Sequence, residues 1–182
     1  MISQQLILSG VGGQGILFIT RLLAETAIAK GLPVMTSETH GMAQRGGIVI
    51  SHLKVGGFSS PLVRPGRADG LIALKPENAL LHRHFLAGSG WIGVNASSLP
   101  EGRGDLPVFP VPADSLALEL KAPRSVNLIV LGRVLVETGR LFCGFEDVRL
   151  ILEKKLATKP SLLQSSLEAF RAGADFAQRA GC

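Results

Sequence analysis

The amino-terminal glycines are the clearest chemical signal in the sequence. Gly10, Gly12 and Gly15 have the G-x-G-x-x-G spacing, after a short apolar run and at the start of a predicted helix. In dinucleotide-binding folds these glycines permit a tight turn, close approach to a phosphate and close helix–strand packing. The N–H groups and dipole at the helix start would favour an anion. We therefore predict a cofactor-binding turn formed by Gly10, Gly12, Gly13, Gln14 and Gly15.

Two other interpretations of this turn remain open. Glycine turns also occur in α/β folds that bind no nucleotide, so the same residues could serve structure alone. The Gly13-Gln14 pair is unusual inside the fingerprint, and the second half of a dinucleotide fold is missing from these 182 residues. Glu38, however, follows the second predicted strand, roughly where a ribose-binding acid would lie. A free-standing nucleotide-binding protein or NAD(P)-dependent oxidoreductase is therefore the alternative function.

A densely polar segment, residues 38–47, follows in an otherwise apolar chain. Its candidate contact residues are Glu38, His40, Gln44, Arg45, Gly46 and Gly47. Such a loop suits contact with a ligand or another subunit better than burial in a core. His40 and Glu38 could form a base and its orienting group, but no recognisable motif fixes a serine or cysteine nucleophile beside them. We predict a hydrogen-bonded contact loop and no catalytic residue.

The composition argues against several classes of protein. Hydrophobic residues make up 46% of the chain and charged residues 18%, which excludes intrinsic disorder. No apolar run approaches the roughly 20 residues that cross a bilayer, and the amino terminus lacks signal-peptide features. We therefore expect a cytoplasmic protein without a membrane span. The charge of +5 comes from scattered bases, with no tyrosine and one tryptophan, which argues against a nucleic-acid partner.

The cysteines and histidines predict no metal site. Cys143 and Cys182 form no CxxC pattern, so the chain cannot hold an iron–sulfur cluster with its own ligands. The four histidines have no recognised zinc spacing. We expect a chain that binds no metal.

The remaining pattern predicts the elements that position these residues. Apolar runs predict strands at 5–9, 33–37, 48–55, 70–74 and 91–95, a returning strand at 58–63, and an edge strand near 108–109. Helical periodicity and end signals predict helices over 13–30, 76–86, 125–139 and 145–155, and another from Pro160. We expect a three-layer Rossmann-like α/β sandwich: a mostly parallel sheet with an antiparallel hairpin, and a helical C-terminal third. Without linkers or repeats, residues 1–182 should form a single domain.

The two amino-terminal motifs together resemble a known family. GVGGQGI at 10–16 and SETHGMAQRGG at 37–47 are similar to the gamma subunit, or gamma domain, of the 2-oxoacid:ferredoxin oxidoreductases. That family includes the pyruvate, 2-oxoglutarate, 2-oxoisovalerate and indolepyruvate enzymes. The similarity extends to Ala169-Phe170-Arg171-Ala172-Gly173, which looks like the family's terminal AF-x-x-G helix. The resemblance therefore spans essentially the whole chain.

The resemblance implies thiamine-diphosphate-dependent oxidative decarboxylation of a 2-oxoacid, usually to an acyl-CoA, with electrons passing to ferredoxin. The sequence lacks the GDG…NN signature of thiamine diphosphate and magnesium binding, and it lacks cluster ligands. We therefore expect a required subunit that is inactive alone. Thiamine diphosphate, magnesium and iron–sulfur clusters are expected on thiamine-diphosphate-binding and ferredoxin-type partner subunits, with coenzyme A as a candidate co-substrate of the complex.

Overall fold

The computed structural model describes residues 2–40, 46–98 and 105–180. Its centre is a six-stranded sheet in the order β2-β3-β1-β4-β5-β6. The strands are β1 Gln4–Val11, β2 Val34–His40, β3 Ile48–Val55, β4 Ala68–Ala73, β5 Leu86–Asn95 and β6 Val108–Val111. Strands β1, β4, β5 and β6 run parallel, whereas β3 pairs antiparallel with both β1 and β2. The mostly parallel sheet and the edge strand β6 confirm the prediction.

The sheet contains antiparallel pairing, as predicted, but the strands that form it are not the predicted ones. The antiparallel strand is β3, which lies between β1 and β2, and residues 58–63 form no strand. Pro61 lies in that segment and cannot donate a ladder hydrogen bond. The segment instead packs on β3: the ammonium of Lys54 lies 5.0 Å from the centre of the Phe58 ring, and the N–H of Val63 donates to His52 Nδ1 (3.2 Å).

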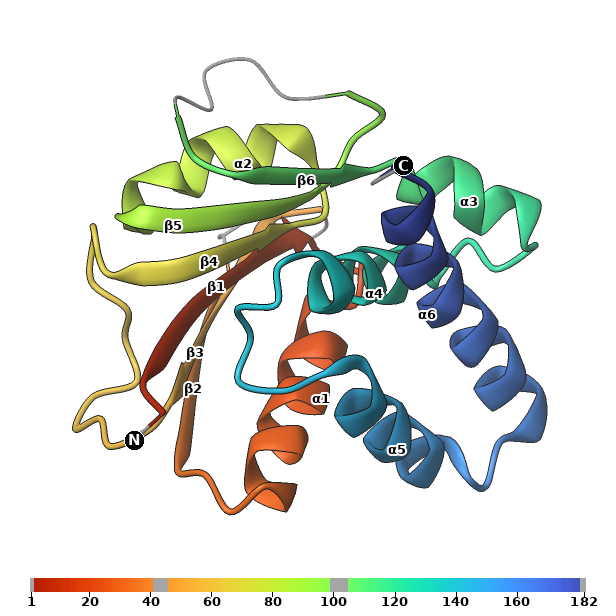
Figure 1. Cartoon of the computed structure of the whole chain (residues 1–182), viewed down its shortest axis with the longest axis horizontal. Helices are drawn as coiled ribbons and strands as arrows, with labels where there is room; N and C mark the ends of the chain where they lie inside the picture. Colours follow the sequence, from red (N-terminus) through yellow and green to blue (C-terminus); the bar gives the residue numbers. More distant parts are fainter. Residues whose placement is uncertain (1, 41–45, 99–104, 181–182) are drawn as a thin grey trace.

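Helices cover both faces of the sheet and make three layers (Figure 1). They are α1 Ile16–Ala29, α2 Pro76–His82, α3 Ala113–Glu119, α4 Val126–Glu137, α5 Phe145–Leu156 and α6 Pro160–Ala180. Helix α2 packs on one face, where Ala79 joins a small core with Ile7 and Leu71. The larger core lies on the other face, where α1, α4, α5 and α6 gather. The predicted helical C-terminal third is confirmed, although the short helix α3 was not predicted.

The terminal AF-x-x-G segment is explained by packing between α4 and α6. A Cβ atom at Gly173 would overlap the backbone oxygen of Ile129, and one at Gly132 would overlap the backbone oxygen of Phe170. Phe170 is fully buried and stacks on Phe145, with ring centres 4.2 Å apart. The two helix backbones therefore approach so closely that only glycine fits at the crossing. This contact holds α4 in place, and α4 in turn contacts the glycine turn.

Candidate functional site

The glycine turn is closed by its own glutamine. Strand β1 runs into the turn, where Gln14 Oε1 accepts a hydrogen bond from the N–H of Val11 (2.7 Å) and the N–H of Gln14 donates to Val11 O (3.1 Å). A Cβ atom at Gly10 would lie 2.9 Å from Ile16 Cγ1 and 3.0 Å from Gln14 Oε1. Gln14, which made the fingerprint unusual, therefore has a structural part. From within the turn, its side chain accepts a hydrogen bond from the last N–H group of β1.

Gly15 ties the turn to α4. Its φ of +80° is left-handed and favours glycine, and it precedes the first residue of α1. Its carbonyl accepts a hydrogen bond from Asn127 Nδ2 (3.1 Å), and a Cβ atom at Gly15 would overlap that same nitrogen. Asn127 is buried, and its Oδ1 accepts from the N–H of Leu128 (2.9 Å). The third glycine of the fingerprint is therefore required by backbone conformation and by a helix–turn contact.

The second motif meets the first through one backbone hydrogen bond. The N–H of Gly12 donates to Gly47 O (2.9 Å), which joins residues 35 positions apart in the sequence. Gly46 is exposed, with a left-handed φ of +75°, and Gly47 is half-buried. Gln44 and Arg45 lie outside the described residues, as does the side chain of His40. The Gly47 end of the predicted contact loop therefore lies directly against the glycine turn.

Glu38 is too far to the side for the ribose-binding position of a dinucleotide fold. It pairs with Ser51 on β3, and Ser51 pairs with Leu8 on β1, so two strand spacings separate Glu38 from β1. At 4.7–4.9 Å per spacing, the separation is about 10 Å. In dinucleotide folds the strand that bears the acid adjoins the first strand. The insertion of β3 therefore weakens the dinucleotide interpretation.

The glycine turn opens onto an apolar groove. The groove has a volume of about 410 Å³ and is lined by Val11, Gly12, Gly13, Gly15, Ile16, Leu17, Phe18 and Val49. None of these described lining residues carries a charge. A pyrophosphate would gain no cationic side chain from this lining, whereas an apolar surface of another protein would bury area against it. The groove therefore suits protein contact better than a nucleotide phosphate.

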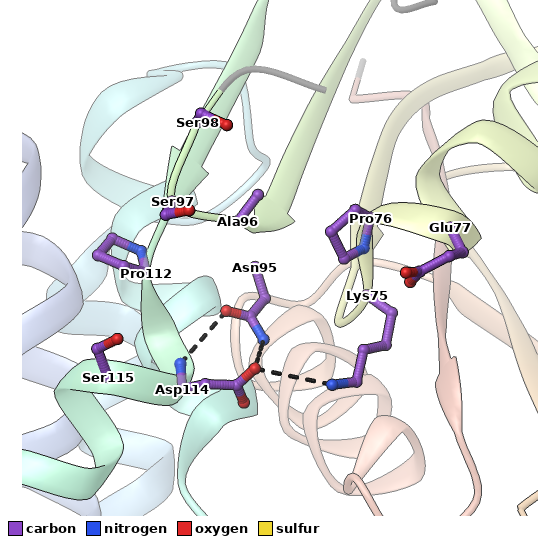
Figure 2. Close-up of a pocket in the computed structure, with 10 residues that line it drawn as sticks. All are labelled: Lys75, Pro76, Glu77, Asn95, Ala96, Ser97, Ser98, Pro112, Asp114 and Ser115. Atoms are coloured by element: carbon purple, nitrogen blue, oxygen red, sulfur yellow. Dashed lines mark hydrogen bonds and ion pairs between the residues drawn. The ribbon is translucent and has the colours of Figure 1, made fainter. Parts of the chain in front are cut away.

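A second, polar pocket was missed by the sequence predictions. It lies where β4, β5 and β6 end, has a volume of about 360 Å³, and its lining includes Lys75, Glu77, Ser97, Ser98 and Ser115 (Figure 2). Open α/β sheets commonly bind ligands outside the carboxyl ends of their parallel strands. Position in the fold therefore makes this pocket a second candidate site.

Asn95 is the centre of a hydrogen-bond network at the polar pocket. Although buried, its amide is fully used: Oδ1 accepts from the N–H groups of Ala113 (3.0 Å) and Asp114 (3.3 Å), and Nδ2 donates to Leu74 O (3.3 Å) and Asp114 Oδ2 (3.0 Å). Lys75 Nζ lies 3.7 Å from the same carboxylate oxygen, as Figure 2 shows. The one sequence signal for this network was an asparagine at the end of an apolar strand.

Candidate metal ligands and reactive thiols were sought among the described residues. They contain no group of three or more His, Cys, Asp or Glu side chains that could hold a metal ion. Burial raises the pKa of the Cys143 thiol to about 12, so Cys143 is not a ready nucleophile. Within the same described residues, no helix is long and apolar enough to cross a membrane.

Comparisons with known proteins agree with this fold. The model of the family described as pyruvate ferredoxin/flavodoxin oxidoreductase matches residues 5–176. The chain is 31% identical to an indolepyruvate oxidoreductase subunit IorB from Archaeoglobus fulgidus, over 92% of each chain. Its structure is similar to pyruvate oxidoreductase subunit PORC from Thermotoga maritima, with TM-score 0.78, 19% identity and coverage of 96% and 97% of the two chains. It also matches a 2-oxoglutarate:ferredoxin oxidoreductase from Magnetococcus marinus, with TM-score 0.81, 21% identity and 98% coverage, but spans only 32% of that chain.

The chain therefore belongs to the pyruvate ferredoxin/flavodoxin oxidoreductase family. The resemblance to the gamma subunits of the 2-oxoacid:ferredoxin oxidoreductases, inferred from the two amino-terminal motifs, is confirmed. The chain is thus a part of an oxidoreductase, and a free-standing NAD(P)-dependent enzyme is not favoured.

Proposed function

We propose that this chain is the small subunit of an indolepyruvate-type 2-oxoacid:ferredoxin oxidoreductase. The observation that carries the substrate class is the match to the Archaeoglobus IorB subunit, which extends over 92% of both chains. The complex would decarboxylate an aryl pyruvate oxidatively and pass electrons to ferredoxin. The chain would act as one domain, residues 1–182, in the cytoplasm.

The catalytic cofactors are proposed to lie on the partner subunits. The described residues offer no ligand set for iron–sulfur clusters or a divalent cation, so no step of decarboxylation or electron transfer is assigned to this chain. Thiamine diphosphate, magnesium and the clusters would lie on the thiamine-diphosphate-binding and ferredoxin-type subunits. Coenzyme A is proposed as the acyl acceptor of the complex, because the Magnetococcus enzyme has been seen with coenzyme A and succinyl-CoA bound.

The glycine turn and the adjoining loop are proposed to contact a partner subunit. The support is the uncharged, apolar groove at the turn and the backbone bond that joins Gly12 to Gly47. On this proposal Gly10, Gly13, Gln14 and Gly15 shape the contact and hold no cofactor themselves. Glu38 and Gly46 would extend the same surface, and His40, Gln44 and Arg45 stay predicted contact residues of the same loop.

The test is co-expression of a tagged copy of this chain with the thiamine-diphosphate-binding subunit from the same cell. The expected result is co-purification of the two subunits and coenzyme-A-dependent reduction of ferredoxin, with indolepyruvate used at the highest kcat/KM. Pyruvate, 2-oxoglutarate and 2-oxoisovalerate are the comparison substrates. A complex that prefers one of these would overturn the substrate class, whereas the absence of any complex would overturn the subunit role.

A further inference from the structure

A third pocket lies between the amino-terminal end of α4, the start of α1 and helix α6. Its volume is about 210 Å³, which is below the usual size of sites for drug-sized ligands. Its apolar wall is formed by Phe18, Leu128, Leu156 and Leu162, of which Leu128 and Leu156 are buried. A compact apolar group such as an aromatic ring could therefore lie against this wall.

Two largely buried serine residues line the pocket, and their hydroxyl groups have no hydrogen-bond partner among the described residues. Ser125 precedes α4 and Ser166 lies on α6, and the two residues are 7% and 4% exposed. Among the described residues, neither side-chain oxygen has a hydrogen-bond partner; Ser125 makes no side-chain cap to α4. Neither hydroxyl is among the fully buried side-chain atoms that lack a partner, so each oxygen can be reached from the pocket. Two such groups from different helical segments are free to donate hydrogen bonds to a polar ligand.

The helix end beside these hydroxyl groups favours an anion. The N–H groups of Leu128 and Ile129 donate to the Ser125 carbonyl, but those of Val126 and Asn127 have no partner among the described residues. Helix α4 is 12 residues long, so its dipole adds positive potential at this end. Arg124 lines the same pocket, and none of the described lining residues is acidic. The polar end of the pocket is therefore electropositive.

We propose that this pocket binds a small organic carboxylate that carries a compact apolar group. The carboxylate accepts hydrogen bonds from Ser125, Ser166 and the free N–H groups of α4, with Arg124 as its counter-charge. The apolar group packs against Phe18 and the leucine side chains. The pocket shares Gly15 and Phe18 with the groove at the glycine turn, so a bound acid would lie next to the proposed partner contact. The proposal does not depend on which 2-oxoacid the complex uses.

The test uses the full chain and phenylacetate as the probe. Isothermal titration should give saturable binding with a Kd of about 1 mM or tighter. Two-dimensional NMR should show that phenylacetate shifts the amide signals of Val126 and Asn127. The neutral isostere phenylacetamide and the ringless anion acetate should each bind at least about tenfold more weakly, because each lacks one of the two recognised parts.

Two variants and a matched control locate the site. Arg124→Gln should weaken phenylacetate binding about tenfold, and Ser166→Ala about threefold, through loss of a counter-charge and a hydrogen bond. Arg64→Gln removes the same charge from an exposed arginine whose neighbour Val63 packs on the opposite face of the sheet, and should change nothing. Equal binding of phenylacetate and phenylacetamide would overturn the proposal. The same holds for the absence of saturable binding, or for Arg124→Gln and Ser166→Ala behaving like Arg64→Gln.

Discussion

The glycine turn after β1 and the polar pocket after β4, β5 and β6 lie at the same edge of one sheet, because these four strands run parallel. Their side chains nevertheless differ in kind. The turn is lined by glycines and apolar residues, closed by Gln14 and by Gly47, whereas the pocket is lined by serines and by a Lys75–Asp114 pair held by Asn95. A glycine fingerprint therefore sets a backbone shape, and the neighbouring side chains decide what that shape is used for.

The largest expected effect is the loss of unfolding free energy caused by a substitution in the glycine turn. Gly15→Ala should destabilise the chain by about 3 kcal/mol, because it combines a left-handed φ with overlap against Asn127. In an Asn127→Ala background the overlap is absent, so the same change should cost only about 1–2 kcal/mol. Urea unfolding of the four chains of this double-mutant cycle measures both values. Equal costs in the two backgrounds would mean that the Asn127 contact does not constrain Gly15.

The polar pocket should be less costly to break. Asn95→Ala removes the acceptor of the Ala113 and Asp114 N–H groups and should cost about 2 kcal/mol of unfolding free energy. Ser97→Ala changes an exposed serine of the same pocket and should stay within about 0.5 kcal/mol. Thermal melts of both variants give the comparison. If Asn95→Ala is as mild as Ser97→Ala, the network does not organise the pocket.

The proposed role of the apolar groove in binding a partner subunit is tested by adding a charge to the groove. Leu17→Asp places a carboxylate in the apolar groove, and should weaken binding to the partner subunit by at least about tenfold. Leu118→Asp on α3 is the matched control, since Leu118 is 75% exposed and lies outside the groove. Biolayer interferometry with the immobilised partner measures both, after a melt has confirmed that each variant is folded. Equal affinities of the two variants for the partner would show that the groove takes no part in the subunit contact.

The smallest expected effect is a loss of unfolding free energy at acidic pH. Burial lowers the pKa of His52, with a further contribution from the charge of Lys54, and burial also lowers the pKa of His82. The unfolded chain therefore binds more protons than the folded chain below about pH 6.5. Stability should be complete above that pH and fall as the pH is lowered through the folded pKa values.

Urea unfolding at pH 5.5 and pH 7.5 measures this fall. It should shrink in His52→Gln and in His82→Gln and persist in His84→Gln, whose parent side chain is exposed. An unchanged fall in both of the first two variants would show that other groups control the acid response.

The sequence predicted the helices and strands better than it predicted which of them lie side by side in the fold. Strand β1, the glycine turn, helix α1 and helices α4 to α6 follow from local periodicity and end signals. The position of β3 between β1 and β2 does not, because the partner of a strand is set by tertiary pairing. That one insertion moved Glu38 away from the turn. The Asn95–Asp114 network was missed for a related reason: Asp114 lies on α3, and the parallel pairing of β5 with β6 brings it to Asn95, 19 positions earlier in the sequence.

We expect this chain to complete an oxidoreductase whose chemistry occurs on other subunits. The most direct test is the rate of indolepyruvate-dependent ferredoxin reduction by the purified partner subunits as increasing amounts of this chain are added. The expected result is a rate near zero without the chain and a saturable rise as it is added, with no activity from the chain alone. Full activity of the partner subunits without this chain would show that the chain is not required.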